Sequence, residues 1–83
     1  MKPEHIEWSR NQFRIMTEGG VWGVPRSGLL WQKRGDELVL KGRMPWHKEM
    51  PCTREQFLQQ QDADIKGISE HMRAAGVKVS HEH

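Results

Sequence analysis

The sequence contains a single cysteine, Cys52, and no apolar run approaching the ~18 residues of a membrane-spanning helix. One cysteine excludes an internal disulfide, which fits a reducing compartment. The first residues lead into an amphipathic segment rather than into the apolar stretch of a secretory signal. These absences predict a cytoplasmic protein that is not inserted in a membrane.

Signatures of metal binding and catalysis are also scarce. No C-x-x-C or H-x-x-x-H spacing occurs, and no phosphate-binding glycine loop or nucleophile elbow is present. His47 and Cys52 share one loop, but a Cys–His nucleophile pair also needs an orienting group and a pocket. Asp62 and Asp64 point to different sides of a predicted helix, so we interpret them as solvated charges. We predict a protein that is not an enzyme and has no metal site and no cofactor.

The chain has 83 residues, which is long enough for one hydrophobic core without disulfides or metal. We expect a single α+β domain over residues 1–80 and a flexible tail over residues 81–83. A domain of this size buries only ~60% of the surface that its unfolded chain exposes. Self-association is therefore one way for the fold to gain stability.

A helix is predicted at the N-terminal end of the domain, over Pro3–Glu18. Pro3 suits the first turn of a helix, and Gly19-Gly20 provides a stop signal. Trp8 lies off the main apolar face of this helix. It either folds over the edge of the core or stays exposed as an anchor for a partner.

A long amphipathic helix is predicted toward the C-terminus. Thr53 and Gln56 have the spacing of a capping box, and Gly76 follows the last periodic residue, Ala75. The apolar face of this helix is expected to hold Phe57, Leu58, Gln61, Ile65, Ile68, Met72 and Ala75.

Between the two helices, turn residues separate short apolar runs. Leu29–Lys33 and Glu37–Met44 flank Gly35-Asp36, which is a good two-residue hairpin turn. Val21–Gly28 is predicted to be an edge strand or an ordered loop, because glycine and proline interrupt it. Val77–Ser80 is a candidate for one more short strand. We expect an antiparallel hairpin or a small sheet of three to four strands.

The turn also predicts which side chains share a face of the hairpin. Trp31 should lie opposite Leu40, and Leu29 opposite Gly42, with Leu38 on the same face, which is the predicted core. The other face is predicted to be solvated and net basic, with Leu30, Gln32, Arg34, Glu37, Val39, Lys41 and Arg43.

Positive charge is concentrated in the middle of the chain. Residues 26–48 hold six basic and two acidic side chains, whereas residues 49–83 hold four basic and six acidic ones. Proteins that bind single-stranded nucleic acid combine basic side chains with aromatic rings. Nucleic-acid binding is therefore an alternative function, although the acidic last helix would oppose a polyanion. Its basic residues would be Arg34, Lys41, Arg43 and Lys48, beside Trp22 and Trp46.

Four tryptophans are many for a chain of this length, and only Trp31 has an evident place in the core. Exposed aromatic and arginine side chains dominate protein–protein contacts. Our first hypothesis is a non-enzymatic interaction protein that binds a protein partner or a second copy of itself. The residues expected to make that contact are Trp22, Arg26, Trp46 and Trp8.

Three short segments carry a resemblance to known proteins: Trp22-Gly-Val-Pro-Arg-Ser-Gly-Leu-Leu, Met44-Pro-Trp and Gln59-Gln60-Gln61-Asp62. With them the chain resembles small uncharacterised proteins encoded by phages and prophages of Gram-negative bacteria. The resemblance implies a short accessory gene product, with a host protein as one conceivable target. It brings no catalytic residues and no cofactor.

Overall fold

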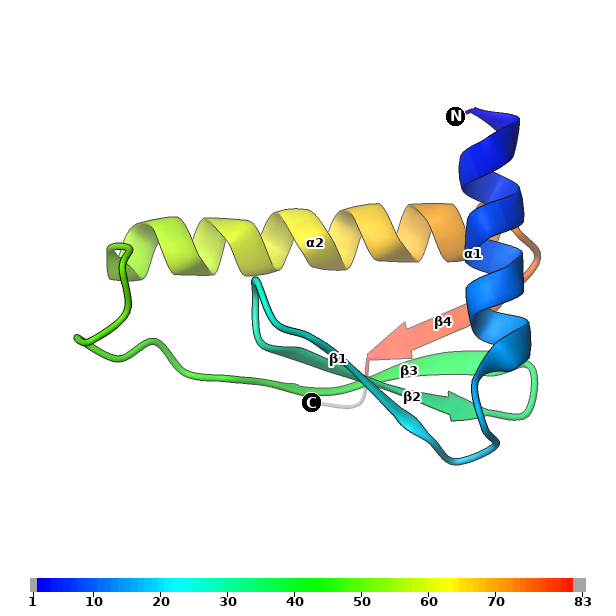
Figure 1. Cartoon of the computed structure of the whole chain (residues 1–83), viewed down its shortest axis with the longest axis horizontal. Coiled ribbons are helices and arrows are strands. Elements are labelled where there is room, and N and C mark those ends of the chain that lie inside the picture. The colour runs from blue at the N-terminus through cyan, green and yellow to red at the C-terminus, as the bar shows by residue number, and fades with distance from the viewer. Residues whose placement is uncertain (1, 82–83) are drawn as a thin grey trace.

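The computed structural model describes residues 2–81 and shows an α+β fold in which two helices pack against a sheet (Figure 1). The elements in chain order are α1 (Pro3–Ile15), β1 (Val21–Val24), β2 (Leu29–Arg34), β3 (Glu37–Arg43), α2 (Arg54–Ala74) and β4 (Lys78–His81). The predicted order of a first helix, a small sheet and a long last helix is confirmed.

The sheet has four strands in the order β1-β2-β3-β4, so β1 and β4 form its edges. The first three strands are antiparallel, and β4 joins β3 in parallel because α2 carries the chain back to the other end of the sheet. Figure 1 shows α2 running along the sheet and α1 crossing near the C-terminal end of α2. The sheet is therefore mixed rather than purely antiparallel.

The core lies between the centre of the sheet and the two helices. Leu29, Trp31, Leu38 and Leu40 are at most 1% exposed and form one cluster with Met72 of α2. Trp31 pairs with Leu40 as predicted. Full burial of each such side chain contributes about 1.5–3 kcal/mol to folding, so this cluster is the main source of stability.

Local sequence signals place the turns and caps where they were expected. The Thr53 side chain accepts a hydrogen bond from the backbone N–H of Gln56, whose side chain accepts one from the Thr53 backbone, so the capping box is confirmed. Gly35 in the β2–β3 turn and Gly76 after α2 have φ values of 60° and 87°, a region that glycine adopts without steric cost.

The first helix ends at Ile15, three residues before the predicted end at Glu18. The β2–β3 hairpin captures the residues that follow the helix. Gly19 donates a backbone hydrogen bond to the carbonyl of Lys33 at 2.9 Å, and the Glu18 carboxylate accepts one from the N–H of Gly35 at 2.7 Å. These tertiary bonds replace the last helical turn.

A β-bulge in β3 changes the predicted faces of the hairpin. The register passes from Trp31↔Leu40 to Leu30↔Gly42, with the bulge at Lys41, so Leu29 pairs with Arg43 and not with Gly42. Paired residues share a face, and Leu29 faces the helices. The prediction that Arg43 lies on the outer face is therefore wrong.

Val39 was predicted to be solvated, but it is 2% exposed. Its strand is central in the sheet, and the register places it between Gln32 of β2 and Ser80 of β4. The predicted tail also starts too early, because His81 ends β4; Glu82 and His83 lie outside the described residues. Pairing with β4 explains both differences, and this pairing joins distant parts of the chain.

Candidate functional site

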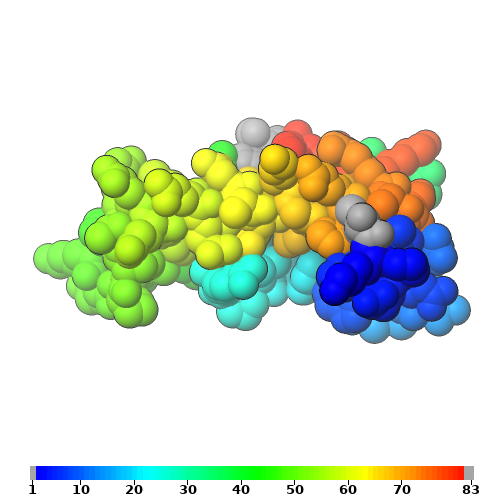
Figure 2. All heavy atoms as spheres, turned by 90° about the horizontal axis from the view of Figure 1, so that it is seen from above, coloured from blue at the N-terminus to red at the C-terminus, as the bar shows by residue number. Residues whose placement is uncertain are grey.

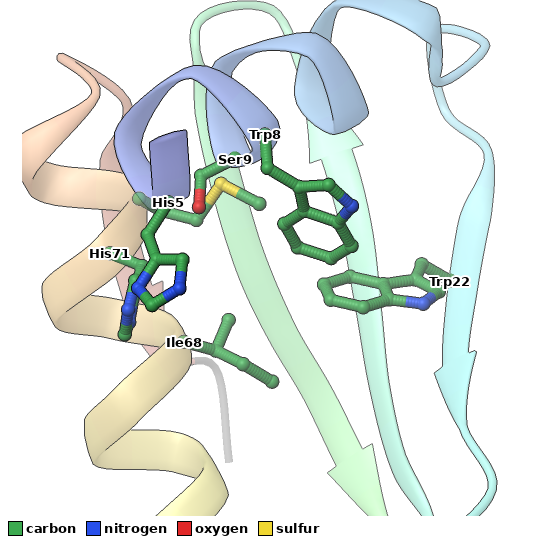
Figure 3. Close-up of a pocket in the computed structure, with 7 residues that line it drawn as sticks. His5, Trp8, Ser9, Trp22, Ile68 and His71 are labelled. Atoms are coloured by element: carbon green, nitrogen blue, oxygen red, sulfur yellow. The ribbon is translucent and has the colours of Figure 1, made fainter. Parts of the chain in front are cut away.

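A groove lies where α1, α2 and β1 meet, and we call it the indole groove after its two tryptophans (Figure 3). It consists of two adjoining hollows of about 220 and 310 Å³. Both hollows are lined by Trp8, Trp22, Ile68 and His71. The first also contacts His5, Ser9 and Met72, and the second also contacts Val24, Arg26, Ala63, Asp64 and Gly67.

The two indoles come from elements of different kinds. Trp22 lies in the edge strand β1 opposite the buried Trp31, so its side chain points to the helix side, where it is half-buried against the core. Trp8 extends from α1 toward Trp22 and remains 54% exposed (Figure 3). Trp8 is therefore not sealed into the edge of the core. The structure brings together Trp8, Trp22 and Arg26, three of the four residues predicted to bind a partner.

Small residues form the α2 wall of the groove. Ala63 and Gly67 are one helical turn apart, and a Cβ atom added at Gly67 would meet no other heavy atom within 4 Å. Glycine in the interior of a helix costs about 1 kcal/mol relative to alanine. No steric contact among the described residues requires glycine at this position, so its effect is to widen the groove.

Asp64 is the buried charge of this groove, at 8% exposure. Its Oδ1 atom accepts hydrogen bonds from Arg26 Nη2 and from Gln60 Nε2, each at 2.8 Å. Its Oδ2 atom is buried and has no hydrogen-bond partner within residues 2–81. The prediction that Asp64 is a solvated charge is therefore wrong, whereas Asp62 is 75% exposed.

The sequence contained an indication that Asp64 lies on the buried face of its helix. Asp64 is seven residues after Phe57, and this spacing returns to the same face of a helix. Phe57 was correctly predicted to face the core. Gly67 was a signal for the groove itself. It lies in the middle of an otherwise uninterrupted helix, and such a glycine often has a packing or functional reason.

Two histidines stand at the α1 end of the groove. The rings of His5 and His71 have centroids 5.6 Å apart (Figure 3). His71 Nδ1 donates a hydrogen bond to the backbone carbonyl of Gly67 at 2.6 Å, because a carbonyl can only accept. Over residues 2–81, no three side chains of the His, Cys, Asp and Glu types come together as they would around a metal ion.

The fourth predicted contact residue, Trp46, does not line the indole groove. It lies in the loop between β3 and α2, where its indole Nε1 donates to the carbonyl of Cys52 at 2.9 Å. The side chain is half-buried in that loop. Trp46 thus closes its own loop through this hydrogen bond.

The basic residues of the nucleic-acid hypothesis do not form one surface. Arg34 and Lys41 belong to the hairpin, while Arg43 reaches α2 and contacts Asp62 at 3.5 Å. Lys48 belongs to the loop before α2, which projects at the far end of the molecule from α1 (Figures 1 and 2). The bulge in β3 is one cause of this separation.

A buried amide holds the β1–β2 turn and the loop after β3 onto α2. Gln61 is 1% exposed, and its Nε2 donates to the carbonyls of Ser27 and Met44 at 2.9 and 2.8 Å. Figure 2 shows the turn, in cyan, beside the middle of α2 and α1, in blue, beside the end of α2. This attachment fixes the position of β1 and therefore one wall of the indole groove.

Comparisons with family models, curated proteins and solved structures find no match for this chain. Neither helix among the described residues combines the length and apolar character needed to cross a membrane.

Proposed function

We propose that this chain is a non-enzymatic interaction protein that binds an extended segment of a partner protein along β1. A side chain of that segment would enter the indole groove. The observation that supports the proposal most directly is the arrangement of Trp8 and Trp22, which line one groove beside an edge strand. Aromatic side chains that are only partly covered supply a large share of binding energy at protein interfaces.

Strand β1 has the backbone geometry to accept another strand. Gly20 O accepts a hydrogen bond from Lys33 N at 3.1 Å, and in an antiparallel ladder every second residue then faces β2. Val21 and Gly23 therefore direct their N–H and C=O groups away from β2. An added strand would bond to these groups and place alternate side chains over the groove.

The nature of α2 is part of the proposal. We take it to be an amphipathic helix whose apolar face covers the sheet and whose small residues, Ala63 and Gly67, leave room beside β1. The resemblance to phage and prophage proteins suggests a bacterial host protein as the source of the bound segment.

Selection from a library of random seven-residue peptides tests the proposal. We expect binders that lose at least tenfold in affinity with Trp8→Ala or with Gly67→Leu, which fills the groove. Leu58→Ala, on α2 but outside the groove, is the matched control and should bind as the wild type does. In addition, the amides of Val21 and Gly23 should become protected from hydrogen exchange on binding.

Three outcomes would refute the proposal. The first is a selection that yields no peptide sensitive to the groove variants, and the second is protection confined to residues outside β1. The third is a stable dimer of the free protein that dissociates with Trp8→Ala, since the groove would then belong to a second copy of this chain.

A further inference from the structure

The two hollows of the indole groove differ in charge. The hollow of about 310 Å³ is bordered by the ion pair between Arg26 and Asp64. The hollow of about 220 Å³, at the α1 end, is lined by seven described residues, and none of these is an aspartate, glutamate, lysine or arginine. We call it the α1-end hollow. A charged side chain would lose its hydration there without meeting an ionic partner, so this hollow suits an uncharged ligand.

Aromatic rings form two opposite walls of the α1-end hollow. The indoles of Trp8 and Trp22 stand on one side of it (Figure 3). The imidazoles of His5 and His71 stand on the other side, with centroids 5.6 Å apart. Aromatic rings pack on one another in offset or edge-to-face arrangements, and such pairs are favourable beyond the area that they bury. A ring placed between the two walls would have partners on both sides.

The size of the α1-end hollow also fits one ring. Its volume is about 220 Å³, whereas an apolar cavity of ~150 Å³ is enough to bind benzene. The remaining lining includes the side chains of Ile68 and Met72. An aliphatic side chain packs on a ring face, and a thioether sulfur makes favourable contacts with aromatic rings.

We propose that the side chain which the partner segment places in the indole groove is aromatic, and that its ring occupies the α1-end hollow between the indoles and the imidazoles. This inference rests on the proposed function and names the residue class that the groove selects. That class is phenylalanine, tyrosine or tryptophan.

Other classes of side chain fit this hollow less well. An acidic side chain would find no cation there, because Arg26 lies outside the α1-end hollow and is bonded to Asp64. A basic side chain would find no carboxylate among the described lining residues. Leucine matches the apolar character of the hollow but gives up the contacts between rings. The experiment must therefore separate an aromatic ring from an aliphatic group of similar size.

Peptides selected for binding to the indole groove are the probes. We expect an aromatic residue to recur at one position of these peptides. With phenylalanine at that position, its replacement by cyclohexylalanine keeps the apolar bulk but removes the aromatic ring, and should lower affinity about fivefold or more. Replacement by leucine also removes buried area and should lower affinity about tenfold or more.

His5→Ala tests the position of the ring. His5 is exposed and lines the α1-end hollow but not the other one, so the variant should be as stable as wild type. We expect it to lower affinity for the phenylalanine peptide about threefold, and to reduce the preference for phenylalanine over cyclohexylalanine at least about twofold. His47→Ala removes an exposed imidazole from the loop before α2 and should change neither value.

The outcomes separate this inference from the proposed function. Groove-sensitive peptides that lack an aromatic residue, or that bind equally well with cyclohexylalanine, would overturn the aromatic class and leave strand binding intact. An unchanged preference in His5→Ala, or an equal change in His47→Ala, would overturn the assignment to the α1-end hollow. A selection without groove-sensitive peptides would refute the proposed function, and this inference with it.

A second measurement on the wild-type protein covers the case in which His5→Ala is unstable. Nuclear Overhauser contacts are recorded between the ring of the bound peptide and the protein. Contacts to the His5 and His71 rings support the assignment. Contacts only to Val24 and Ala63, which line the other hollow, overturn it.

Discussion

The same face of one sheet is closed at its centre and open at the β1 side, although the same two helices cover both parts. At the centre, Trp31 is fully buried beneath α2 and packs with Met72. One strand away its register partner Trp22 lines the indole groove together with the exposed Trp8. Two neighbouring indoles therefore have different roles: Trp31 fills the core, and Trp22 borders a surface.

The difference comes from the side chains that α2 directs to each part. Toward the centre it presents Phe57, Gln61 and Met72, which are all at most 2% exposed. Toward β1 it presents Ala63 and Gly67, which are too small to reach the strand and leave the groove. A helix with large side chains on one stripe and small ones on the next both closes a core and leaves a groove.

The largest effect is expected for Trp31→Ala. Truncating a buried tryptophan costs about 3–5 kcal/mol, which is comparable to the whole stability of a small domain. The variant should be largely unfolded at 25 °C, as measured by circular dichroism. If the free energy of unfolding falls by less than about 1 kcal/mol, the centre of the sheet is not packed more tightly than the β1 side.

Gln61→Leu should have the next largest effect. The substitution keeps the approximate volume but leaves the carbonyls of Ser27 and Met44 without their donor, at a cost of about 1–3 kcal/mol. Urea unfolding measures this loss, and Gln59→Leu, exposed on the same helix, is the control that should change little. Equal stability of the two variants would mean that Gln61 does not fix the wall of the groove.

Gly67→Ala should separate stability from binding. Alanine is favoured over glycine in a helix by about 1 kcal/mol, and the added Cβ meets nothing within 4 Å, so the variant should be more stable in urea. The same methyl group narrows the groove and should weaken peptide binding. The reciprocal change, Ala63→Gly, should lower stability by a similar amount and spare binding. If Gly67→Ala binds peptides better than wild type, the open space beside Gly67 is not needed for peptide binding.

The smallest effect on stability is expected for Trp8→Ala. More than half of this side chain is exposed, so the free energy of unfolding should change by at most about 0.5 kcal/mol. Thermal unfolding measures this value, while affinity for the selected peptides should fall at least tenfold. A loss of stability approaching that of Trp31→Ala would erase the contrast between the closed centre and the open groove.

The features predicted correctly depend on neighbouring residues. The Gly35-Asp36 turn and the Thr53–Gln56 capping box follow from the conformations that those residues prefer, and both are present. The burial of Trp31 was also predicted, because a turn fixes the register close to it. Each of these predictions needed only a few consecutive residues.

The predictions that were wrong concern contacts between distant segments. The β-bulge at Lys41 moved Arg43 to the helix side, where it contacts Asp62, and pairing with β4 helped to enclose Val39. The buried Asp64 accepts a hydrogen bond from Arg26, which lies 38 residues earlier in the chain. These contacts depend on how the sheet and helices pack. The helical spacing of Asp64 from Phe57 indicates its face of α2, but not its partner Arg26.

The sequence by itself determined the class of fold and the order of its helices and strands. It did so because periodicity and turn chemistry act over a few residues. Only the tertiary structure decided that Trp8, Trp22 and Arg26 lie together while Trp46 lies elsewhere. Their proximity depends on α1 crossing near the end of α2 and on β1 being held against α2 through Gln61, and both are long-range packing events.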